Sequence, residues 1–270
     1  MKLKDIHPSK QSSATPYKKQ DPEVVINTEW TINGAAKPLN DLGLFTVWDK
    51  ALDRTCDAPG FQPFEYMTAG RYLGELVRII VLLWCTEMVG YNFEDLPEAL
   101  RTRNQLSTTF LATVVAPAED PILLAATLDE ALPAPKNSRW RWGLESAKMV
   151  MQAAQAVQLR SAALIAAATV GLMACAGELS LSDESRRSKE QQTNGHTNSR
   201  SGTVEELVVA YTGGLITLYP GFKEETQRQV DQLLRRESYR NRAKRVVLRE
   251  ASDGGIIGAG VLAGTVLNSA

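Results

Sequence analysis

The sequence predicts an α/β fold, and three observations carry this prediction. Two long segments, 63–89 and 144–177, repeat apolar or small residues at helical spacing. Toward the carboxyl end, runs with strand character alternate with helical runs, which is the pattern of an α/β domain. The chain has 270 residues, of which 44% are hydrophobic, so it can bury a large core as one domain or two small ones.

Composition excludes several classes of function. The chain has 30 basic and 31 acidic residues and a net charge of −1, so no overall basic field favours binding to nucleic acid or to an anionic membrane. The two histidines, His7 and His196, lie in polar stretches, which leaves little material for a histidine triad or a histidine metal site. We expect the three cysteines to be reduced core residues: Cys56, Cys85 and Cys175.

The amino-terminal segment 1–22 is expected to be a flexible tail. It contains lysines but no apolar run, so it is not a secretory signal, and a cytoplasmic protein is predicted, with nuclear or mitochondrial association left open. The uncharged run 161–177 is shorter than the roughly 20 residues that span a bilayer, which favours a buried helix over a membrane span.

The domain is expected to comprise residues 23–270. Its first half should begin with a short buried strand at 24–27, followed by a loop and a short helix within 39–57. The strongest helix signal starts at Pro63, and Gly90 follows its end. Its buried face is predicted to contain Leu73, Leu76, Val77, Ile80, Leu83 and Trp84. Glu65 then lies in the first turn of this helix, where the helix dipole favours a carboxylate.

In the second half we expect two or three short helices up to residue 131, a break at 133–140, and the alanine-rich helix 144–177. A polar insert at about 181–203 is predicted to be disordered. Two strands, 207–211 and 215–219, should form a hairpin around Thr212, Gly213 and Gly214. The last predicted elements are a helix at 222–236, a strand at 244–250, and a glycine turn that opens an apolar helix.

Five segments resemble, in order, the large domain of eukaryotic hexokinases. They are INTEW, FEYMTAGRYLGELVRIIVL, LRTRNQLSTTFL, YTGGLITLYPGF and SDGGIIGAGVLAG. The resemblance runs from about residue 24 to 267 and implies the large lobe of an actin-like ATPase or ribonuclease-H-like fold. It also implies a chemistry, in which the 6-hydroxyl of a hexose such as glucose is phosphorylated from ATP with Mg.

The resemblance also implies site residues. Glu29 and Glu65 match glutamates that accept sugar hydroxyls, and a charged acceptor holds such hydroxyls strongly. The matches to the nucleotide side are Thr108, Gly213, Gly214, Gly254 and Gly255, with Arg71 as a charge near the phosphates. Read without the resemblance, the two glutamates are a turn residue and a dipole complement, the glycines form a plain hairpin, and the arginine is solvated.

The sequence also departs from the family pattern. It lacks the phosphate-binding Asp-Leu-Gly-Gly-Thr segment, the sugar-clamping Ser/Thr-Lys region and the Asn-Asp-Thr segment with the catalytic Asp, which is the general base. Within the retained part, Thr31 stands for a glycine, Ala112 for a serine and Thr212 for an aspartate. The turn 254–258 reads Gly-Gly-Ile-Ile-Gly instead of Gly-Ser-Gly-Arg-Gly, which removes polar partners from a nucleotide pocket.

Two hypotheses explain this combination. In the first, the chain is a degenerate hexokinase without catalysis that acts as a regulatory or interaction module, senses sugar and has a protein partner. In the second, it is the carboxy-terminal part of an active hexokinase whose catalytic lobe is missing from this chain. A scaffold that binds no sugar is a third alternative.

Overall fold

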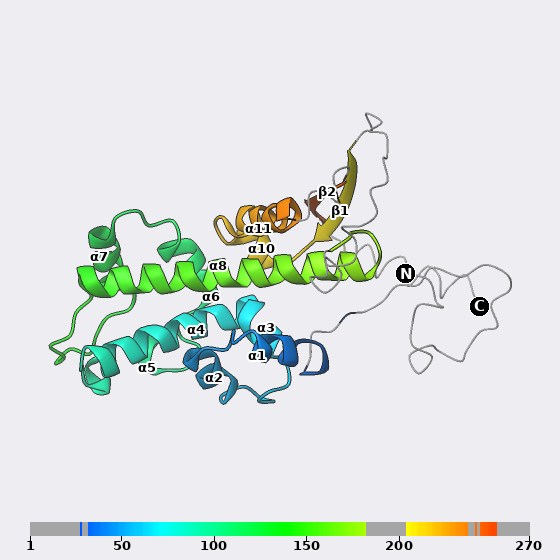
Figure 1. Cartoon of the computed structure of the whole chain (residues 1–270). Coiled ribbons are helices and arrows are strands. Elements are labelled where there is room, and N and C mark those ends of the chain that lie inside the picture. The colour runs from blue at the N-terminus through cyan, green and yellow to red at the C-terminus, as the bar shows by residue number, and fades with distance from the viewer. Residues whose placement is uncertain (1–27, 29–31, 182–203, 237–240, 242–243, 253–270) are drawn as a thin grey trace, which may run out of the picture.

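The computed structural model describes residues 28, 32–181, 204–236, 241 and 244–252. Its longest element is the helix α8 (Leu144–Cys175), which lies between two groups of elements (Figure 1). On one side it packs against α3 (Pro63–Thr68) and α4 (Gly70–Leu83). On the other it packs against α7 (Pro121–Ala131) and α11 (Phe222–Arg236), so α8 is the shared wall of the fold.

The predicted helix from Pro63 onward is interrupted. Ala69 has an extended backbone, with ψ of 137°, so the segment forms two helices, α3 and α4, instead of one. Glu65 therefore lies in the first turn of α3, a helix of 6 residues, and not of a long helix. A π-helical turn, η4 (Trp84–Met88), continues α4, and Gly90 ends the segment with a φ of 84°, as predicted.

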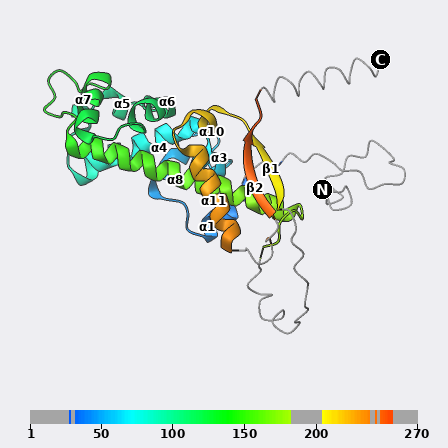
Figure 2. The ribbon, with the colours of Figure 1, turned by 90° about the horizontal axis from the view of Figure 1, so that it is seen from above.

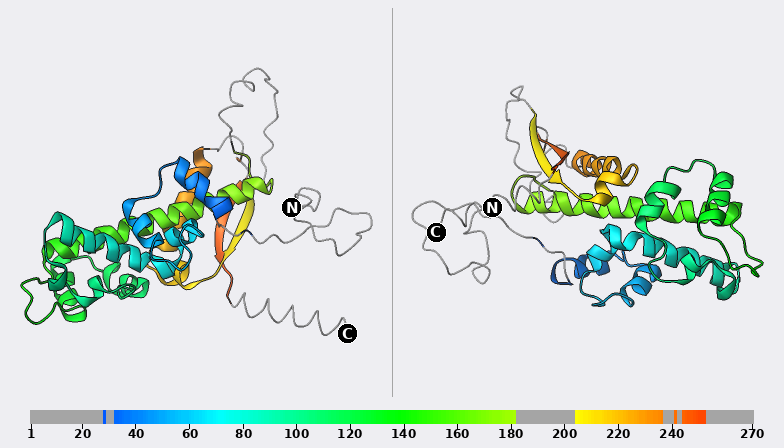
Figure 3. Two further views of the ribbon diagram at one scale, coloured as in Figure 1. Left: turned by 90° about the horizontal axis from the view of Figure 1, so that it is seen from below. Right: turned by 180° about the vertical axis from the view of Figure 1, so that it is seen from behind.

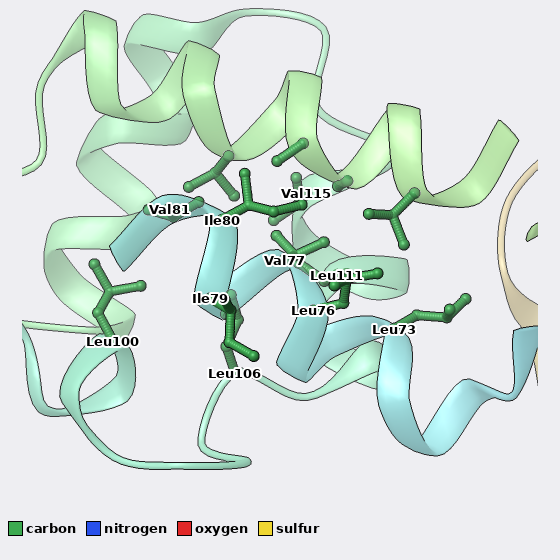
Figure 4. Packing of buried hydrophobic residues seen from close by; sticks show 14 of the residues in the cluster. Leu73, Leu76, Val77, Ile79, Ile80, Val81, Leu100, Leu106, Leu111 and Val115 are labelled. Atoms are coloured by element: carbon green, nitrogen blue, oxygen red, sulfur yellow. The ribbon is translucent and has the colours of Figure 1, made fainter. Parts of the chain in front are cut away.

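The apolar face of α4 carries the main core, as its spacing predicts. Four of the predicted positions are buried at 8% exposure or less, namely Leu73, Leu76, Val77 and Ile80, whereas Leu83 and Trp84 are half-buried. Figure 4 shows Leu73, Leu76, Val77 and Ile80 of α4 among apolar side chains of neighbouring segments. The core is thus formed by helix-to-helix packing, and the sheet takes no part in it.

Short helices surround α4 and precede α8. Before it come η3 (Ile32–Ala36), α1 (Lys37–Asp41) and α2 (Val47–Asp53); after it come η5 (Phe93–Asp95), α5 (Glu98–Arg101), α6 (Thr108–Phe110) and the π-helical turn η6 (Leu111–Val115). These confirm the short helix within 39–57 and the short helices before residue 131. The break at 133–140 is confirmed as irregular backbone.

The predicted long helix at 144–177 is confirmed by α8, whose small residues allow close packing: Ala147, Ala154, Ser161, Ala162 and Ala166 are buried. Among the described helices, α8 is long and apolar enough to cross a membrane by length and composition. Its flanks pack against other helices (Figure 3), but only 28% of its most apolar stretch is buried, so the predicted buried helix is confirmed only in part. Cys56 and Cys85 are buried free thiols. Cys175 is exposed, contrary to expectation, because it lies in the last turn of α8, beyond the packed stretch.

The predicted hairpin is wrong. Only its first strand forms, as β1 (Glu205–Tyr211), while the second run becomes the short helix α10 (Gly214–Leu218). This helix lies close to the beginning of α4. A Cβ added to Gly70 would lie only 3.4 Å from the Cβ of Leu215. β1 pairs in parallel with β2 (Lys244–Glu250), and such a connection needs a crossover, which α11 provides (Figure 2).

The sheet region has its own small core. Val246 of β2 and Val230 of α11 are fully buried, and they pack with Ala166 and Val170 of α8. The predicted helix 222–236 and strand 244–250 are therefore confirmed. The predicted strand at 24–27, nearly all of the polar insert and the final glycine turn with its helix lie outside the described residues.

Candidate functional site

A pocket of about 290 Å³ joins two of the predicted nucleotide residues, Thr108 and Gly214. They are distant in the sequence and belong to different elements, α6 and α10, which meet at the beginning of α4. The remaining lining is provided by Gly70, Thr109, Ala112, Thr113, Leu215, Leu218 and Tyr219. The structure therefore places the two segments predicted to bind nucleotide around one open volume.

Thr108 is fixed by hydrogen bonds to α4. Its hydroxyl donates to the carbonyl oxygen of Gly70 and accepts from the backbone N–H of Gly74 at 2.8 Å. Because a hydroxyl has one proton and two lone pairs, one lone pair of Thr108 remains available to a ligand. The side chain can accept from a bound molecule, but its proton is already engaged.

Gly74 permits the close approach that these hydrogen bonds require. A Cβ at this position would lie 2.5 Å from the backbone nitrogen of Thr108 and still closer to the carbonyl oxygen of Leu106. Those are backbone atoms, so they cannot move aside as a flexible side chain can. Gly74 was not among the predicted site residues, although a glycine inside a strongly periodic helix is a signal of close packing.

The segment that leads to Thr108 is tied to α4 by a buried ion pair. Arg78 donates to both carboxylate oxygens of Glu75, at 2.8 and 2.7 Å, and the two side chains are only 9% and 1% exposed. Arg78 also donates to the carbonyl oxygen of Leu100 at 2.5 Å, and Glu75 accepts from the backbone N–H of Asn104 at 2.6 Å. We call Glu75 and Arg78 the buried clamp. Neither residue was predicted to be buried, because residue type alone does not show that a charged pair within a helix is buried.

The glycine turn forms the opposite side of the pocket. Gly213 has a φ of 119°, a conformation that favours glycine, and it precedes the first residue of α10. Leu218 is exposed at 74%, whereas Tyr219 is buried, and burial raises the pKa of Tyr219 to about 12. Together with Ala112 and Leu215, these residues give the pocket mainly apolar walls, which suit the faces of a planar base better than a charged phosphate.

Arg71 does not line this pocket. Its side chain is exposed, and its guanidinium lies 5.6 Å from the ring centroid of Tyr72, within the range of a cation–π contact. Tyr72 in turn meets Tyr66 edge to face, with ring centroids 5.0 Å apart. The structure thus places Arg71 beside an aromatic pair, and its role near the phosphates stays a prediction.

Glu65 is half-buried on α3, and its carboxylate forms no hydrogen bond or ion pair with any other part of the described chain. Burial is the main cause of the raised pKa of Tyr72, and the negative charge of Glu65 raises this pKa further, so the two groups are neighbours. Glu29, the second predicted sugar residue, lies outside the described residues, as do Gly254 and Gly255. A joint site of Glu29 and Glu65 therefore stays a prediction.

The described residues provide no obvious metal centre. No three His, Cys, Asp or Glu side chains gather among them in a way that could hold an ion. A magnesium ion bound with ATP would take most of its ligands from phosphate oxygens and water.

The comparisons with known proteins all point to the same family. A family model described as hexokinase matches residues 1–265. Hexokinase-1 of Nicotiana tabacum is 29% identical over 243 residues, and hexokinase-1 of Oryza sativa subsp. japonica is 30% identical over 262. These matches cover 89% and 96% of this chain but only 42% and 44% of the relatives, so the chain spans about two fifths of their length.

Solved structures support the same fold. A hexokinase from Schistosoma mansoni complexed with glucose superposes with a TM-score of 0.62 at 28% identity, over 87% of this chain and 44% of that one. A second hexokinase crystal structure has a TM-score of 0.53 at 24% identity, which supports the fold alone. The predicted actin-like, ribonuclease-H-like fold is confirmed by these neighbours.

Proposed function

Because the chain belongs to the hexokinase family, we propose that it forms the nucleotide-binding side and one sugar-binding wall of an ATP-dependent hexose phosphotransferase site. The pocket shared by Thr108 and Gly214 carries this proposal, since it joins two segments that match the family's nucleotide-binding segments. Glucose is the favoured hexose, because the Schistosoma mansoni neighbour is described as complexed with glucose.

Each part of the site has a physical role in this proposal. The apolar walls around Ala112 and Leu215 take the adenine base, and the Gly213 turn lets backbone approach the ribose. The carboxylate of Glu65, which lacks a protein partner in the described structure, accepts hydrogen bonds from hydroxyl groups of the sugar. Mg enters as the complex with ATP, in which phosphate oxygens and water supply most of its ligands.

We further propose that this chain alone binds its ligands without transferring the phosphoryl group. Its sequence lacks the family's catalytic Asp and phosphate-binding segment, and phosphoryl transfer depends on both positioning and charge stabilisation. In this form it acts as a sugar-sensing regulatory or interaction module with a protein partner.

The alternative is that the chain is the carboxy-terminal part of an active hexokinase that phosphorylates glucose at the start of glycolysis. The coverage of about two fifths of the relatives' length favours this alternative, because the remaining parts contain the catalytic segments in the family. A complementary segment, present in the same protein or supplied in trans, would then complete the cleft.

A turnover assay and a binding titration separate these proposals. Glucose-dependent ADP formation is measured with MgATP, and sugar binding is followed by tryptophan fluorescence. Turnover of about 1 to 100 per second by this chain would contradict the inactive module. Saturable glucose binding without turnover supports it. Addition of the complementary part of a hexokinase restores turnover only under the alternative.

One substitution tests the sugar wall. Glu65→Gln should weaken glucose binding about tenfold or more, because it replaces a charged acceptor with a neutral one. Glu98→Gln is the matched control, since Glu98 also lies in the first turn of a short helix but far along the chain in α5. Equal titration curves for both variants and the parent chain would remove Glu65 from the site.

A further inference from the structure

A second pocket, of about 300 Å³, lies between α1, α2 and α3, and it shares no lining residue with the pocket of Thr108 and Gly214. Its volume is at the lower end of the roughly 300 to 1,000 Å³ found for small-molecule sites. Its apolar walls come from Ala36, Phe45, Pro63, Tyr66 and Met67. We call it the α2–α3 pocket; it can enclose a small apolar group.

Most polar atoms that line the α2–α3 pocket are already engaged. Both carboxylate oxygens of Asp49 accept from the guanidinium of Arg160, at 2.7 and 2.8 Å. Asp49 also accepts from the backbone N–H of Thr46 at 2.8 Å. The hydroxyl of Tyr66 donates to the carbonyl oxygen of Ala58 at 2.8 Å. These groups build the walls and have little capacity left for a ligand.

Two charged groups of opposite sign remain available, beside the exposed amide of Asn40, which also lines the pocket. Asp53 uses one carboxylate oxygen, which accepts from the backbone N–H of Gly60 at 2.7 Å, and its other oxygen has no partner in the described structure. The ammonium group of Lys50 forms neither a hydrogen bond nor an ion pair there. Residues three apart lie on the same face of a helix, so α2 presents both groups to the same pocket.

We propose that the α2–α3 pocket binds a small zwitterion with an apolar side chain, namely a hydrophobic α-amino acid. Its carboxylate pairs with Lys50, its ammonium group pairs with Asp53, and its side chain packs against the apolar walls. A simple anion would pair with Lys50 but also meet the charge of Asp53, and a simple cation would meet that of Lys50. Only a ligand with both charges satisfies the two groups together.

The position of the pocket gives such binding a consequence for α3. Pro63, Tyr66 and Met67, three of the 6 residues of α3, line it, and the same helix carries Glu65. A ligand in the pocket therefore packs directly on the helix that presents the proposed sugar-binding carboxylate. Binding itself does not depend on whether the chain binds sugar or nucleotide, so it is tested separately from the proposed function.

The experiment is isothermal titration of the full chain with L-phenylalanine, L-phenylalaninamide and N-acetyl-L-phenylalanine. We expect saturable binding of the amino acid and about tenfold weaker binding of each blocked form, because each loses one charge-assisted contact. Lys50→Met should remove the preference over the amide. Asp53→Asn, which keeps an oxygen for the Gly60 N–H, should remove the preference over the acetylated form.

Lys37→Met is the matched control, because Lys37 is an exposed lysine of α1 that pairs with Asp41 and does not line the pocket. It should bind all three compounds like the parent chain. Ala36→Leu, which fills the pocket, should weaken the binding of all of them. Absence of saturable binding up to the solubility of phenylalanine, or binding that Lys50→Met and Ala36→Leu both leave unchanged, would overturn the proposal. Thermal melts serve as the control that each variant is folded.

Discussion

The buried clamp allows a test in which burial is the main variable. Arg78→Met removes the guanidinium and leaves the carboxylate of Glu75, which is 1% exposed, without its charged partner. Breaking a buried pair in this way costs about 3 to 5 kcal/mol, because an uncompensated charge stays in the interior. For a domain of this size each kcal/mol lowers Tm by about 2 to 4 °C, so the expected loss is about 6 to 20 °C.

The chain contains a matched control for this experiment. Glu225 and Arg228 of α11 have the same spacing and the same two-point geometry, at 2.7 and 2.6 Å, but Arg228 is 59% exposed, whereas Glu225 is 13% exposed. In Arg228→Met, Glu225 keeps the hydrogen bond from the side-chain amide of Gln229 at 2.7 Å, so the cost should be only about 1 kcal/mol. Unfolding in urea, followed by circular dichroism, measures both variants. A loss for Arg78→Met that is no larger than the loss for Arg228→Met would refute the reasoning from burial.

The clamp also separates stability from site geometry. The double variant Glu75→Gln with Arg78→Met removes both charges, so it should recover part of the stability lost in Arg78→Met. It does not restore the charged hold on the backbone of Asn104, in the segment that leads to Thr108. ATP binding, measured by titration, should therefore stay weaker in the double variant than in the parent chain. Full recovery of ATP affinity would show that the clamp does not position the pocket.

Gly74→Ala should destabilise the domain and weaken ATP binding, because the added Cβ meets backbone atoms of the segment 106–108. In Gly171→Ala of α8 the added Cβ meets nothing within 4 Å, so this control should raise the free energy of unfolding by about 0.5 to 1 kcal/mol. Urea unfolding that shows the same sign of change for both variants would contradict this reasoning. Thr108→Val should cost about 1 to 3 kcal/mol, since it leaves the N–H of Gly74 without its acceptor, and Thr108→Ser should retain most of the stability in the same assay. Burial raises the pKa of Tyr66 and Tyr219 from 10.0 to about 12, so their contribution to stability is complete below pH 10 and is lost as the pH rises toward 12. Ultraviolet titration of tyrosinate should show that at least these two groups ionise late, with the pKa of Tyr72 also raised, and uniform ionisation near pH 10 would refute this.

The sequence predicted the elements whose signal is local and repeated. The face of α4 with Leu73, Leu76 and Val77 was correct because a buried helix face requires that spacing, and α8 was correct because no glycine turn or proline interrupts it. The run 215–219 was assigned to a strand because a short apolar run does not distinguish strand from helix. In the structure Leu215 lies close to Gly70 at the beginning of α4, a neighbour that no local pattern reveals.

The site was predictable to a similar degree. The likeness to the family placed Thr108 and Gly214 in one nucleotide site, and the structure brings them to one pocket. It did not predict that the proton of Thr108 is engaged by Gly70, or that Arg71 turns toward Tyr72. The buried clamp was missed because a glutamate and a basic residue three residues apart usually form a solvated pair, as Glu145 and Lys148 do. Burial depends on neighbours that are distant in the chain.

The position of α8 has a consequence for how the molecule comes apart. Ala162 belongs to the main core and Ala166, one turn later, belongs to the small core beside the strands. A helix that seals two interiors so close together cannot loosen on one side without exposing the other. Amides in the middle of α8 should therefore exchange with solvent only when the whole described domain opens, whereas the ends of the helix should exchange earlier through local fraying.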